Sequence, residues 1–521
     1  MSTPEHVLLE TIRESWLRGS LEIIVGAGAS MASGLPGWNA LNYNLLSLFF
    51  HEALSALDPE HEELCALSTV FAERFGREAV VDLVRQNLGE GEAFCGLLER
   101  ALYEGRRRLE LAPIQLELAA AVGIHGKPGP AGLYTFNYDD LLQDALEALH
   151  GVRPATVTRG IPPHEAHVVH LHGFLPPGAT TAQGTIILSE KDYLRGVNSW
   201  ADRKLEDLFD SQKDVLLVGL SLGDPRLRRL LFRRLERKGQ PRSNPDGYGR
   251  VFALLGQSRC GDGADLATRR AHKIVNRFEL PYWGAWDVHV GLVERHDLVP
   301  FHLRQIRLGR DPLAWLELGR TFLRERSRFF EDLYEPEVQL QATHYLKHQH
   351  RTLRSRYAVP PGEEVQVGIM APSAAEPGSV QLAFHFGDGP PAVGGDGLDS
   401  DTTFQPLTEQ AAAPSRLDLA ALRRLAGPIS RALVTGTVVC ATSDSPVPEP
   451  GQPFGHALGR TLLCVPIYDS AQWVPLGVAV LASNRATPFW AGLKHPEAAG
   501  LHRSLRAMFA ALLGVERHGA R

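Results

Sequence analysis

The chain has few cysteines, and their spacing excludes two classes of small stabilised fold. Its five cysteines are Cys65, Cys95, Cys260, Cys440 and Cys464, and no two form a CxxC pair. This spacing offers neither a disulfide framework nor a zinc ribbon. It fits a reducing compartment, and we expect the protein to be cytoplasmic.

Long apolar runs and an excess of positive charge are also lacking. Residues 1–18 are charged and amphipathic without the apolar stretch of a signal peptide, and no segment is apolar for the length of a membrane span. We therefore expect no membrane association. The formal net charge of -6 gives no overall attraction for nucleic acid. The basic stretch at 226–234 is typical of a solvated helix face, so we expect no nucleic-acid partner.

Glycine, proline and hydrophobic residues are plentiful. The 521 residues include 50 Gly and 35 Pro, and 44% of them are hydrophobic. This composition is typical of a soluble globular protein with many turns. The length favours two to four domains, of which we infer two.

Short apolar runs alternate with helical patterns over residues 1–310. The runs are 21–25, 132–136, 167–171, 185–188, 215–220 and 251–255. Unalternated short strands separated by helices predict a Rossmann-like α/β fold, with a doubly wound, mostly parallel sheet covered on both faces. Residues 40–125 show helical periodicity almost throughout and predict a helical subdomain beside the sheet.

The pattern changes twice in the remainder of the chain. Residues 311–357 have the periodicity of one or two long helices, and we expect a helical linker there. Residues 358–521 predict an α+β domain, because strand-like runs precede a closing helix. The runs are 365–370, 380–386, 435–440, 461–467 and 476–482, with a Gly/Pro/Asp-rich loop at 387–401 and the helix at 496–513.

Four clusters of small or polar residues follow predicted strands, which is where open α/β sheets bind ligands. The first is the glycine loop, Gly26, Ala27, Gly28, Ala29 and Ser30, which continues through Pro36 to Trp38. Glycines at a strand-to-helix turn let backbone amides approach a pyrophosphate. Because position 31 is Met31, the GxGxxG fingerprint is not matched, and a tight turn without a ligand stays open.

The second cluster is TFNYDD at 135–140. Asn137 and Asp139 are expected at the carboxyl edge of the sheet, either facing a ligand or capping the next helix. The fourth cluster is GLSLGDP at 219–225. Ser221 and Asp224 there either meet a ribose or phosphate or form an ordinary helix cap.

The third cluster is the histidine-rich strand at 164–174. The HExxH zinc motif is not matched, because Glu165 lies between His164 and His167. On a strand, His170 and His172 share one face, and His172 lies where the strand ends. No companion set of cysteines or acidic residues has ligand spacing, so we expect no metal.

In this order the four clusters resemble the sirtuin superfamily. The glycine loop with SGLP resembles the family's adenine-nucleotide loop, TFNYDD its TQNID element, HLHG its catalytic histidine motif and GLSLGDP its GTSL turn. The resemblance implies that Asn137 holds the nicotinamide ribose or the attacking water, that Asp139 faces the nicotinamide amide, and that His172 is the general base. The implied NAD-binding residues are Gly26, Ala27, Gly28, Ala29, Ser30, Pro36, Trp38, Ser221 and Asp224.

One departure from that family bears on the reaction. Deacylating sirtuins carry four zinc-ligating cysteines after the histidine motif, whereas residues 175–214 contain none. NYDDLL, HLHGF, LSEKDY and GLSLGDPRLRRLL resemble the bacterial sirtuin-like domains of antiphage defence effectors, over residues 20–310. This resemblance implies an NAD glycohydrolase, with NAD as substrate and no metal. An imidazole of ordinary pKa near 6.5 is a competent base at neutral pH.

The second domain resembles a GAF domain in LLCVPI at 462–467 followed by PLGVAVLAS at 475–483. The resemblance implies a sensor for an activating ligand or protein, and dimerising helices at 311–357 would make the protein a homo-oligomer. A purely structural or oligomerising domain stays open.

Together these features lead us to expect a regulated NAD hydrolase that releases nicotinamide and ADP-ribose as an abortive-infection effector against phage. Two alternatives stay open. The first is a sirtuin-type protein deacylase or ADP-ribosyltransferase, and the second is a non-enzymatic NAD-binding sensor. The sequence does not identify the trigger, and it does not distinguish hydrolysis from cyclisation of ADP-ribose.

Overall fold

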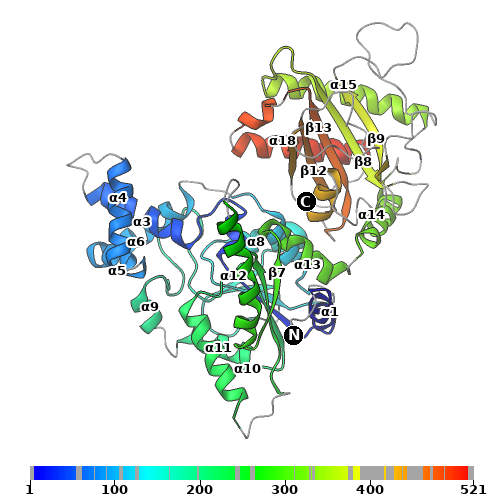
Figure 1. Cartoon of the computed structure of the whole chain (residues 1–521). Helices are drawn as coiled ribbons and strands as arrows, with labels where there is room; N and C mark the ends of the chain where they lie inside the picture. Colours follow the sequence, from blue (N-terminus) through cyan, green and yellow to red (C-terminus); the bar gives the residue numbers. More distant parts are fainter. Residues whose placement is uncertain are drawn as a thin grey trace. The chain divides into compact units, whose positions relative to one another are not determined.

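The structure is a computed structural model (Figure 1). It describes residues 5–53, 61–75, 77–89, 91–104, 109–123, 128–163, 165–195, 199–240, 247–258, 265–309, 311–327, 330, 332, 335–372, 380–387, 416–417, 428–436, 438–442, 461–469, 473–485, 487–493 and 495–513. The chain divides into two compact units, Met1–Arg307 and Leu308–Arg521.

A parallel sheet forms the centre of the first unit. Its described strands are β1 (Leu21–Val25), β2 (Gly132–Thr135), β3 (Ala155–Val157), β4 (His167–His170), β5 (Asp214–Val218), β6 (Val251–Gly256) and β7 (Val288–Val293). The strand order is β3-β4-β2-β1-β5-β6-β7, and every pair is parallel. β1, β2, β4 and β5 are buried along their whole length, as expected for strands covered on both faces. The prediction of an α/β fold with a parallel sheet is confirmed.

The strand order reverses at β1. The chain passes from β1 to β2 on one side, and later places β5 on the other side of β1. In doubly wound sheets, such a switch point opens a crevice at the carboxyl ends of the strands. The loops after β1, β2, β4 and β5 therefore share one edge of the sheet.

The prediction of a strand at 185–188 is wrong. These residues form an extended segment outside the sheet, and the Ile187 amide donates to the His172 carbonyl at 3.1 Å. The side chains of Ile186 and Leu188 instead join the core of the helical subdomain. The sequence analysis also missed β3 and β7, which lie at the two edges of the sheet, where burial is incomplete and the apolar signal is weaker.

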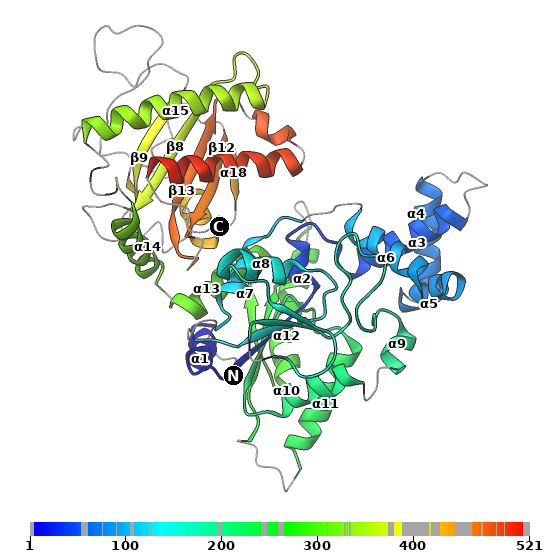
Figure 2. The ribbon, with the colours of Figure 1, turned by 180° about the vertical axis from the view of Figure 1, so that it is seen from behind.

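The helices of the first unit cover the faces of this sheet or, in the case of α3 to α6, form a helical subdomain beside it. They are α1 (Glu5–Leu17), α2 (Ala27–Met31), α3 (Trp38–Ala53), α4 (His61–Phe75), α5 (Arg77–Leu88), α6 (Glu92–Tyr103), α7 (Pro113–Ala120), α8 (Leu141–His150), α9 (Glu190–Arg195), α10 (Trp200–Asp210), α11 (Pro225–Lys238), α12 (Leu266–Gly284), η3 (His296–Leu298) and α13 (Val299–Leu308). Helix α12 lies in front of the strands in Figure 1, and α7 and α8 lie in front of them from behind, in Figure 2. The described part of 40–125 is mainly helical, and α3, α5 and α6 share a hydrophobic core.

The second unit is built on an antiparallel sheet. Its described strands are β8 (Val365–Pro372), β9 (Val380–Gly387), β10 (Arg416–Leu417), β11 (Val439–Thr442), β12 (Thr461–Tyr468) and β13 (Pro475–Ser483), in the order β10-β9-β8-β13-β12-β11. Its helices are α14 (Pro312–Arg326), α15 (Pro336–Arg356), α17 (Pro428–Thr435), η4 (Phe489–Gly492) and α18 (His495–Leu512). The strand expected at 435–440 starts later, because Thr435 still belongs to α17. Of the loop expected at 387–401, Gly387 ends β9, and the remainder lies outside the described residues.

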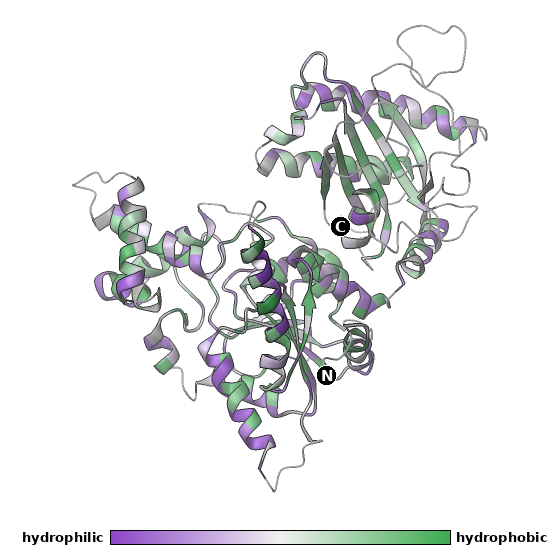
Figure 3. Cartoon of the chain, viewed as in Figure 1, coloured by the Kyte–Doolittle hydropathy of each residue, from purple (hydrophilic) through white to green (hydrophobic). Residues whose placement is uncertain are grey.

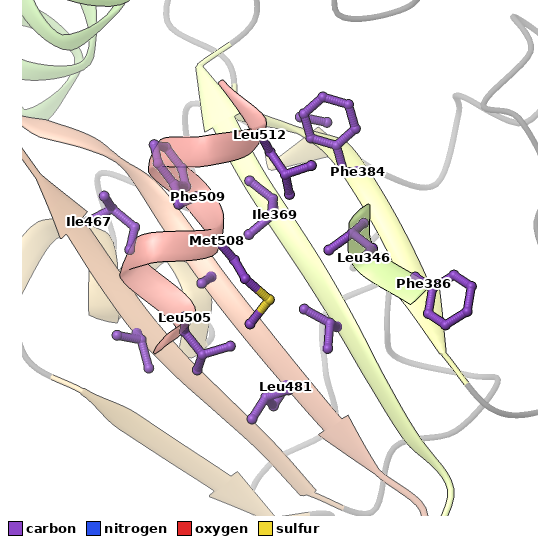
Figure 4. Close-up of a cluster of buried hydrophobic side chains, with 14 of the residues drawn as sticks. Leu346, Ile369, Phe384, Phe386, Ile467, Leu481, Leu505, Met508, Phe509 and Leu512 are labelled. Carbon is purple, nitrogen blue, oxygen red and sulfur yellow. The ribbon is translucent and has the colours of Figure 1, made fainter. Parts of the chain in front are cut away.

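Helices α15 and α18 pack against this second sheet. Figure 4 shows Leu346 of α15 and Met508 of α18 among side chains of the strands, including Ile369 and Phe384. The strands themselves are mainly hydrophobic in Figure 3. Leu323 of α14 belongs to the same core. The segment that we expected as a linker therefore contributes to the core of the second unit, because its apolar stripes need a surface to cover them.

Among the helices that the structure describes, none is both long and apolar enough to span a bilayer.

Candidate active site

Three residues from two loops form a hydrogen-bonded chain at the switch point. The side-chain nitrogen of Asn137, Nδ2, donates to Ser30 Oγ at 2.7 Å, and Ser30 Oγ donates to Asp139 Oδ2 at 2.7 Å. Asn137 also donates to the Gly26 carbonyl at 3.1 Å. The structure thus joins the glycine loop after β1 to the TFNYDD segment after β2.

The backbone around Asn137 is fixed by two buried side chains. Thr135 Oγ1 accepts the Asn137 amide hydrogen at 3.0 Å and donates to the Val25 carbonyl at 3.2 Å. His170 contacts the Asn137 carbonyl through Nδ1 at 2.9 Å, and its Nε2 lies 2.8 Å from the Gln143 side-chain nitrogen. Because an amide nitrogen only donates, His170 Nε2 accepts and Nδ1 carries the proton. Burial lowers the pKa of His170 to about 4, so the ring is neutral at pH 7.

Asp139 is buried and lies at the start of α8. Burial raises the pKa of this carboxyl to about 6, while hydrogen bonds from Ser30 and the Leu141 amide act in the opposite direction. The Leu141 amide donates to Asp139 Oδ1 at 3.2 Å. Asp139 therefore stabilises the first turn of α8 and contacts the glycine loop at the same time, whereas the Asn137 side chain makes no such cap.

The glycine loop packs directly against the GLSLGDP turn after β5. The Gly28 amide donates to the Gly219 carbonyl at 2.9 Å, and the Gly26 amide donates to the Val218 carbonyl at 2.9 Å. A Cβ at Gly26 would lie 2.3 Å from Leu220 Cδ2, so no larger residue fits there without displacement. The two amides are occupied within the protein, and these glycines serve the close approach of two loops.

His172 is buried between two aromatic rings. Its imidazole stacks on Phe136 with ring centroids 4.5 Å apart, and the Tyr193 ring meets it edge-on at 5.9 Å. Nε2 has no hydrogen-bond partner in the described part of the chain and lies 3.9 Å from Asp224 Oδ2. Burial lowers the pKa of His172 to about 4, although Asp224 acts in the opposite direction. The ordinary value near 6.5 that we expected is therefore wrong for this structure.

Three of the residues implied in NAD binding take no part in the contacts around Asn137 and His172, namely Ser221, Pro36 and Trp38. Ser221 is exposed, and its Oγ accepts the Gly223 amide hydrogen at 3.3 Å. Trp38 begins α3 and packs against the core of the helical subdomain. Of the hydrogen bonds described, none joins these three residues to Asn137 or His172. Ala27, in the glycine loop, is exposed.

Sequence reasoning assigned no role to four residues that support the site. These are Thr135, His170, Gln115 and Tyr193. Gln115 of α7 donates to the Ala29 carbonyl at 2.6 Å, which holds the glycine loop from the far side. Two of the four had a signal, since Tyr193 closes the LSEKDY segment and His170 lies in the histidine-rich cluster. A single Thr or Gln at a helical or strand position carries none.

A doubly wound parallel sheet with polar loops gathered at its switch point is the architecture of nucleotide-binding α/β domains. Residues 131–276 match the family model of the SIR2-like domain, which supports the sirtuin-like part of our expectation and an NAD-related activity. The matched segment contains Asn137, Asp139, His172, Ser221 and Asp224, and the glycine loop precedes it. Within the described residues, no group of three or more His, Cys, Asp or Glu is arranged to hold a metal ion.

Further comparisons add little. No curated protein matches the chain. One similar solved structure is type II free methionine-R-sulfoxide reductase from Thermoplasma acidophilum, at 14% identity over 34% of this chain and 96% of that chain, with a TM-score of 0.21.

Proposed function

We propose that the protein is an NAD hydrolase that cleaves the bond between nicotinamide and ribose, releasing nicotinamide and ADP-ribose. The observation that carries this proposal is the connection of Ser30, Asn137 and Asp139 beside His172 at the switch point. Such a placement suits a dinucleotide whose reactive ribose lies over the carboxyl ends of the strands. The SIR2-like match at 131–276 supports NAD as the substrate.

In this reaction the protein positions the ribose and the attacking water and accepts one proton. The glycosidic bond breaks with its electron pair going to the nicotinamide nitrogen, and a water oxygen bonds to the anomeric carbon. Asn137 orients the ribose or that water, Asp139 accepts a hydrogen bond from the nicotinamide amide, and His172 takes the proton of the water. His172 is neutral at pH 7 because of its lowered pKa, so it is in the form that accepts a proton. The proton then passes to solvent.

We further propose that the second unit is a GAF-like sensor or oligomerisation domain. It would respond to an activating ligand or protein and release the hydrolase during phage infection. Its antiparallel sheet with packed helices suits such a module, and the LLCVPI and PLGVAVLAS segments lie on its adjacent strands β12 and β13. The homo-oligomer and the cytoplasmic location belong to the same proposal.

The test is product analysis with the full chain. NAD is incubated with wild-type protein, Asn137→Ala and His172→Ala, and nicotinamide, ADP-ribose and cyclic ADP-ribose are quantified. We expect both variants to lose at least about a hundredfold in rate. Asn44→Ala is the matched control, because Asn44 also lies in the first unit but bonds to the Ala101 carbonyl of α6.

Calorimetric titration with NAD covers the case of a resting enzyme that awaits its trigger. We expect binding by the wild-type chain even without turnover. Protein that neither binds NAD nor releases nicotinamide contradicts the proposal, and acyl transfer from an acetyl-lysine peptide would favour a deacylase instead.

A further inference from the structure

Asp224, which the sequence suggested as an NAD contact, has both carboxylate oxygens engaged within the protein. Oδ1 accepts the Leu227 amide hydrogen at 2.8 Å at the start of α11. Oδ2 accepts the Tyr193 hydroxyl hydrogen at 2.9 Å. Two donors from different elements fix the position of this carboxylate.

The same Oδ2 faces His172. His172 Nε2 is buried without a hydrogen-bond partner among the described residues, and Asp224 Oδ2 lies 3.9 Å from it. Because Leu227 and Tyr193 hold the carboxylate in place, a small rotation of the His172 ring would close this gap to a hydrogen bond. A buried polar atom without a hydrogen-bond partner is unfavourable, so a hydrogen bond between His172 Nε2 and Asp224 would stabilise the site.

The segment that carries Tyr193 is fixed by hydrogen bonds of the adjacent residue, Asp192. Asp192 Oδ2 accepts the amide hydrogens of Leu188 and Ser189, at 2.9 and 2.8 Å. Arg85 of α5 pairs with Asp192 Oδ1 at 2.5 Å and donates to the Ile186 carbonyl at 3.1 Å. The LSEKDY segment is thereby attached to the helical subdomain, and Tyr193 presents its ring edge to His172 and its hydroxyl to Asp224.

We propose that Tyr193 and Asp224 are positioning residues for His172, a role that rests on the proposed NAD hydrolysis. Asp224 holds the proton on His172 Nε2, which leaves Nδ1 to accept the proton of the attacking water. The carboxylate then stabilises the imidazolium that forms, and Tyr193 keeps the carboxylate aimed at the ring. Asp224 acts on catalysis through His172 and makes no direct contact with NAD.

Two conservative variants test this role in the full chain. Asp224→Asn keeps an oxygen for the Leu227 amide but removes the charge, and Tyr193→Phe keeps the ring but removes the hydroxyl. We expect Asp224→Asn to lower kcat by about tenfold to a hundredfold and Tyr193→Phe by about fivefold. The Kd for NAD, measured by calorimetry in the slow His172→Ala background, should change by less than about threefold in either variant.

Non-additivity gives a second readout. Because Tyr193 acts through Asp224, the double variant should be no slower than Asp224→Asn alone, and neither change should lower the residual rate of His172→Ala. Tyr103→Phe is the matched control, since it also removes a buried tyrosine hydroxyl, one that donates to the Leu175 carbonyl at 2.7 Å. We expect it to leave kcat unchanged.

The outcomes separate this proposal from the proposed function. An active wild type with unchanged kcat in both variants overturns the positioning role alone, as does a tenfold weaker Kd with kcat intact, which would make Asp224 an NAD contact. A further rate loss in the His172→Ala background also overturns it. Wild-type protein that binds NAD but releases no nicotinamide, with or without phage challenge in cells, overturns the proposed hydrolysis and this role with it.

Discussion

His170 is the last residue of β4 and His172 lies in the turn that follows, and their ring nitrogens differ in what they contact. Both nitrogens of His170 are hydrogen-bonded, to the Asn137 carbonyl and to Gln143. His172 has a buried Nε2 without a hydrogen-bond partner in the described structure. His170 therefore supports the backbone of Asn137, whereas His172 has a nitrogen available for a change in bonding during the reaction.

His170→Ala should destabilise the first unit by about 1 to 3 kcal/mol, because it leaves the Asn137 carbonyl and the Gln143 amide without their buried partner. Urea unfolding at pH 7 measures this loss. His150→Ala is a suitable control, since that histidine is only partly buried, beside the Ala119 carbonyl. An unfolding free energy equal to that of the wild type would contradict the supporting role.

The stability of the protein should fall as the pH drops from about 6.5 towards 4. Burial lowers the pKa of both His170 and His172 to about 4, whereas an unfolded histidine titrates near 6.5. The unfolded chain thus binds more protons in this window, which favours unfolding as the pH falls. Asp139 acts in the opposite sense over part of the window, but two histidines outweigh one carboxyl. Unfolding free energies of wild type and His170→Ala at pH 7 and pH 5 should show a smaller decline in the variant.

For the proposed NAD hydrolysis, we expect Asp139 to give the pH profile of the rate an acid limb near pH 6. Burial raises its pKa to about 6, and only the ionised carboxylate accepts hydrogen bonds with both oxygens. The contribution of Asp139 to stability is present below pH 3.8 and is lost as the pH rises through about 6, so its ionisation lowers the stability. The proposed hydrogen bond from the nicotinamide amide requires the ionised carboxylate. kcat/KM should rise through pH 6 in the wild type. In Asp139→Asn it should be lower at pH 7.5 by about tenfold and lack this limb, and a limb that persists would exclude Asp139 as its source.

At the scale of elements, the contact between the loops after β1 and β5 holds the site together. A Cβ at Gly26 would lie 2.3 Å from Leu220 Cδ2 and 2.7 Å from the Gly219 carbonyl oxygen. Gly219 has φ +69°, and a Cβ there would lie 2.7 Å from the Ala29 nitrogen. The two loops can approach this closely only with glycine on both sides.

Gly26→Ala should therefore destabilise the first unit by about 1 to 3 kcal/mol and weaken NAD binding, because the loops must separate to admit the methyl group. Thermal unfolding and calorimetry measure the two effects. Gly96→Ala in α6 is the matched control: a Cβ there meets nothing within 4 Å, so we expect unchanged or slightly higher stability. Equal behaviour of the two variants would contradict the tight loop contact.

At the scale of the whole molecule, the boundary between the two units lies just before α14, so the segment that we expected as a linker belongs to the second unit. Trp315 and Leu323 of α14, and Leu346 and Leu353 of α15, are buried in the second unit. Each buried leucine contributes about 2 kcal/mol from its removal from water. A truncation after α15 would expose these side chains, whereas one after α13 would not.

A chain ending at residue 309 should therefore be monodisperse in size-exclusion chromatography, whereas one ending at residue 357 should aggregate. The shorter chain should also change either the basal NAD hydrolysis or the oligomeric state, if the second unit is a sensor or an oligomerisation domain. Monodisperse behaviour of the 1–357 chain would contradict the assignment of α14 and α15 to the second core. Unchanged rate and unchanged oligomeric state of the 1–309 chain would leave the second unit without a regulatory role.

Much of the first unit was readable from local patterns. Uniformly apolar runs such as 215–218 predicted parallel strands covered on both faces, because burial on both faces leaves no polar alternation. The four polar clusters could be ordered along the chain from sequence alone. The run at 185–188 was misread, because an apolar extended segment has the same composition as a buried strand and only its hydrogen bonds distinguish the two.

The sequence by itself determined the parallel α/β architecture and the resemblance of its strand-end clusters to sirtuin motifs. Only the tertiary structure decided that Ser30 bonds to Asn137 and Asp139, which lie more than a hundred residues further along the chain. The tertiary structure also decided that burial lowers the pKa of His172 and that Tyr193 donates to Asp224. The physical reason is one of range. Periodicity and strand composition are local properties, whereas hydrogen bonds between loops and the burial of an ionisable side chain depend on which distant segments the fold brings together.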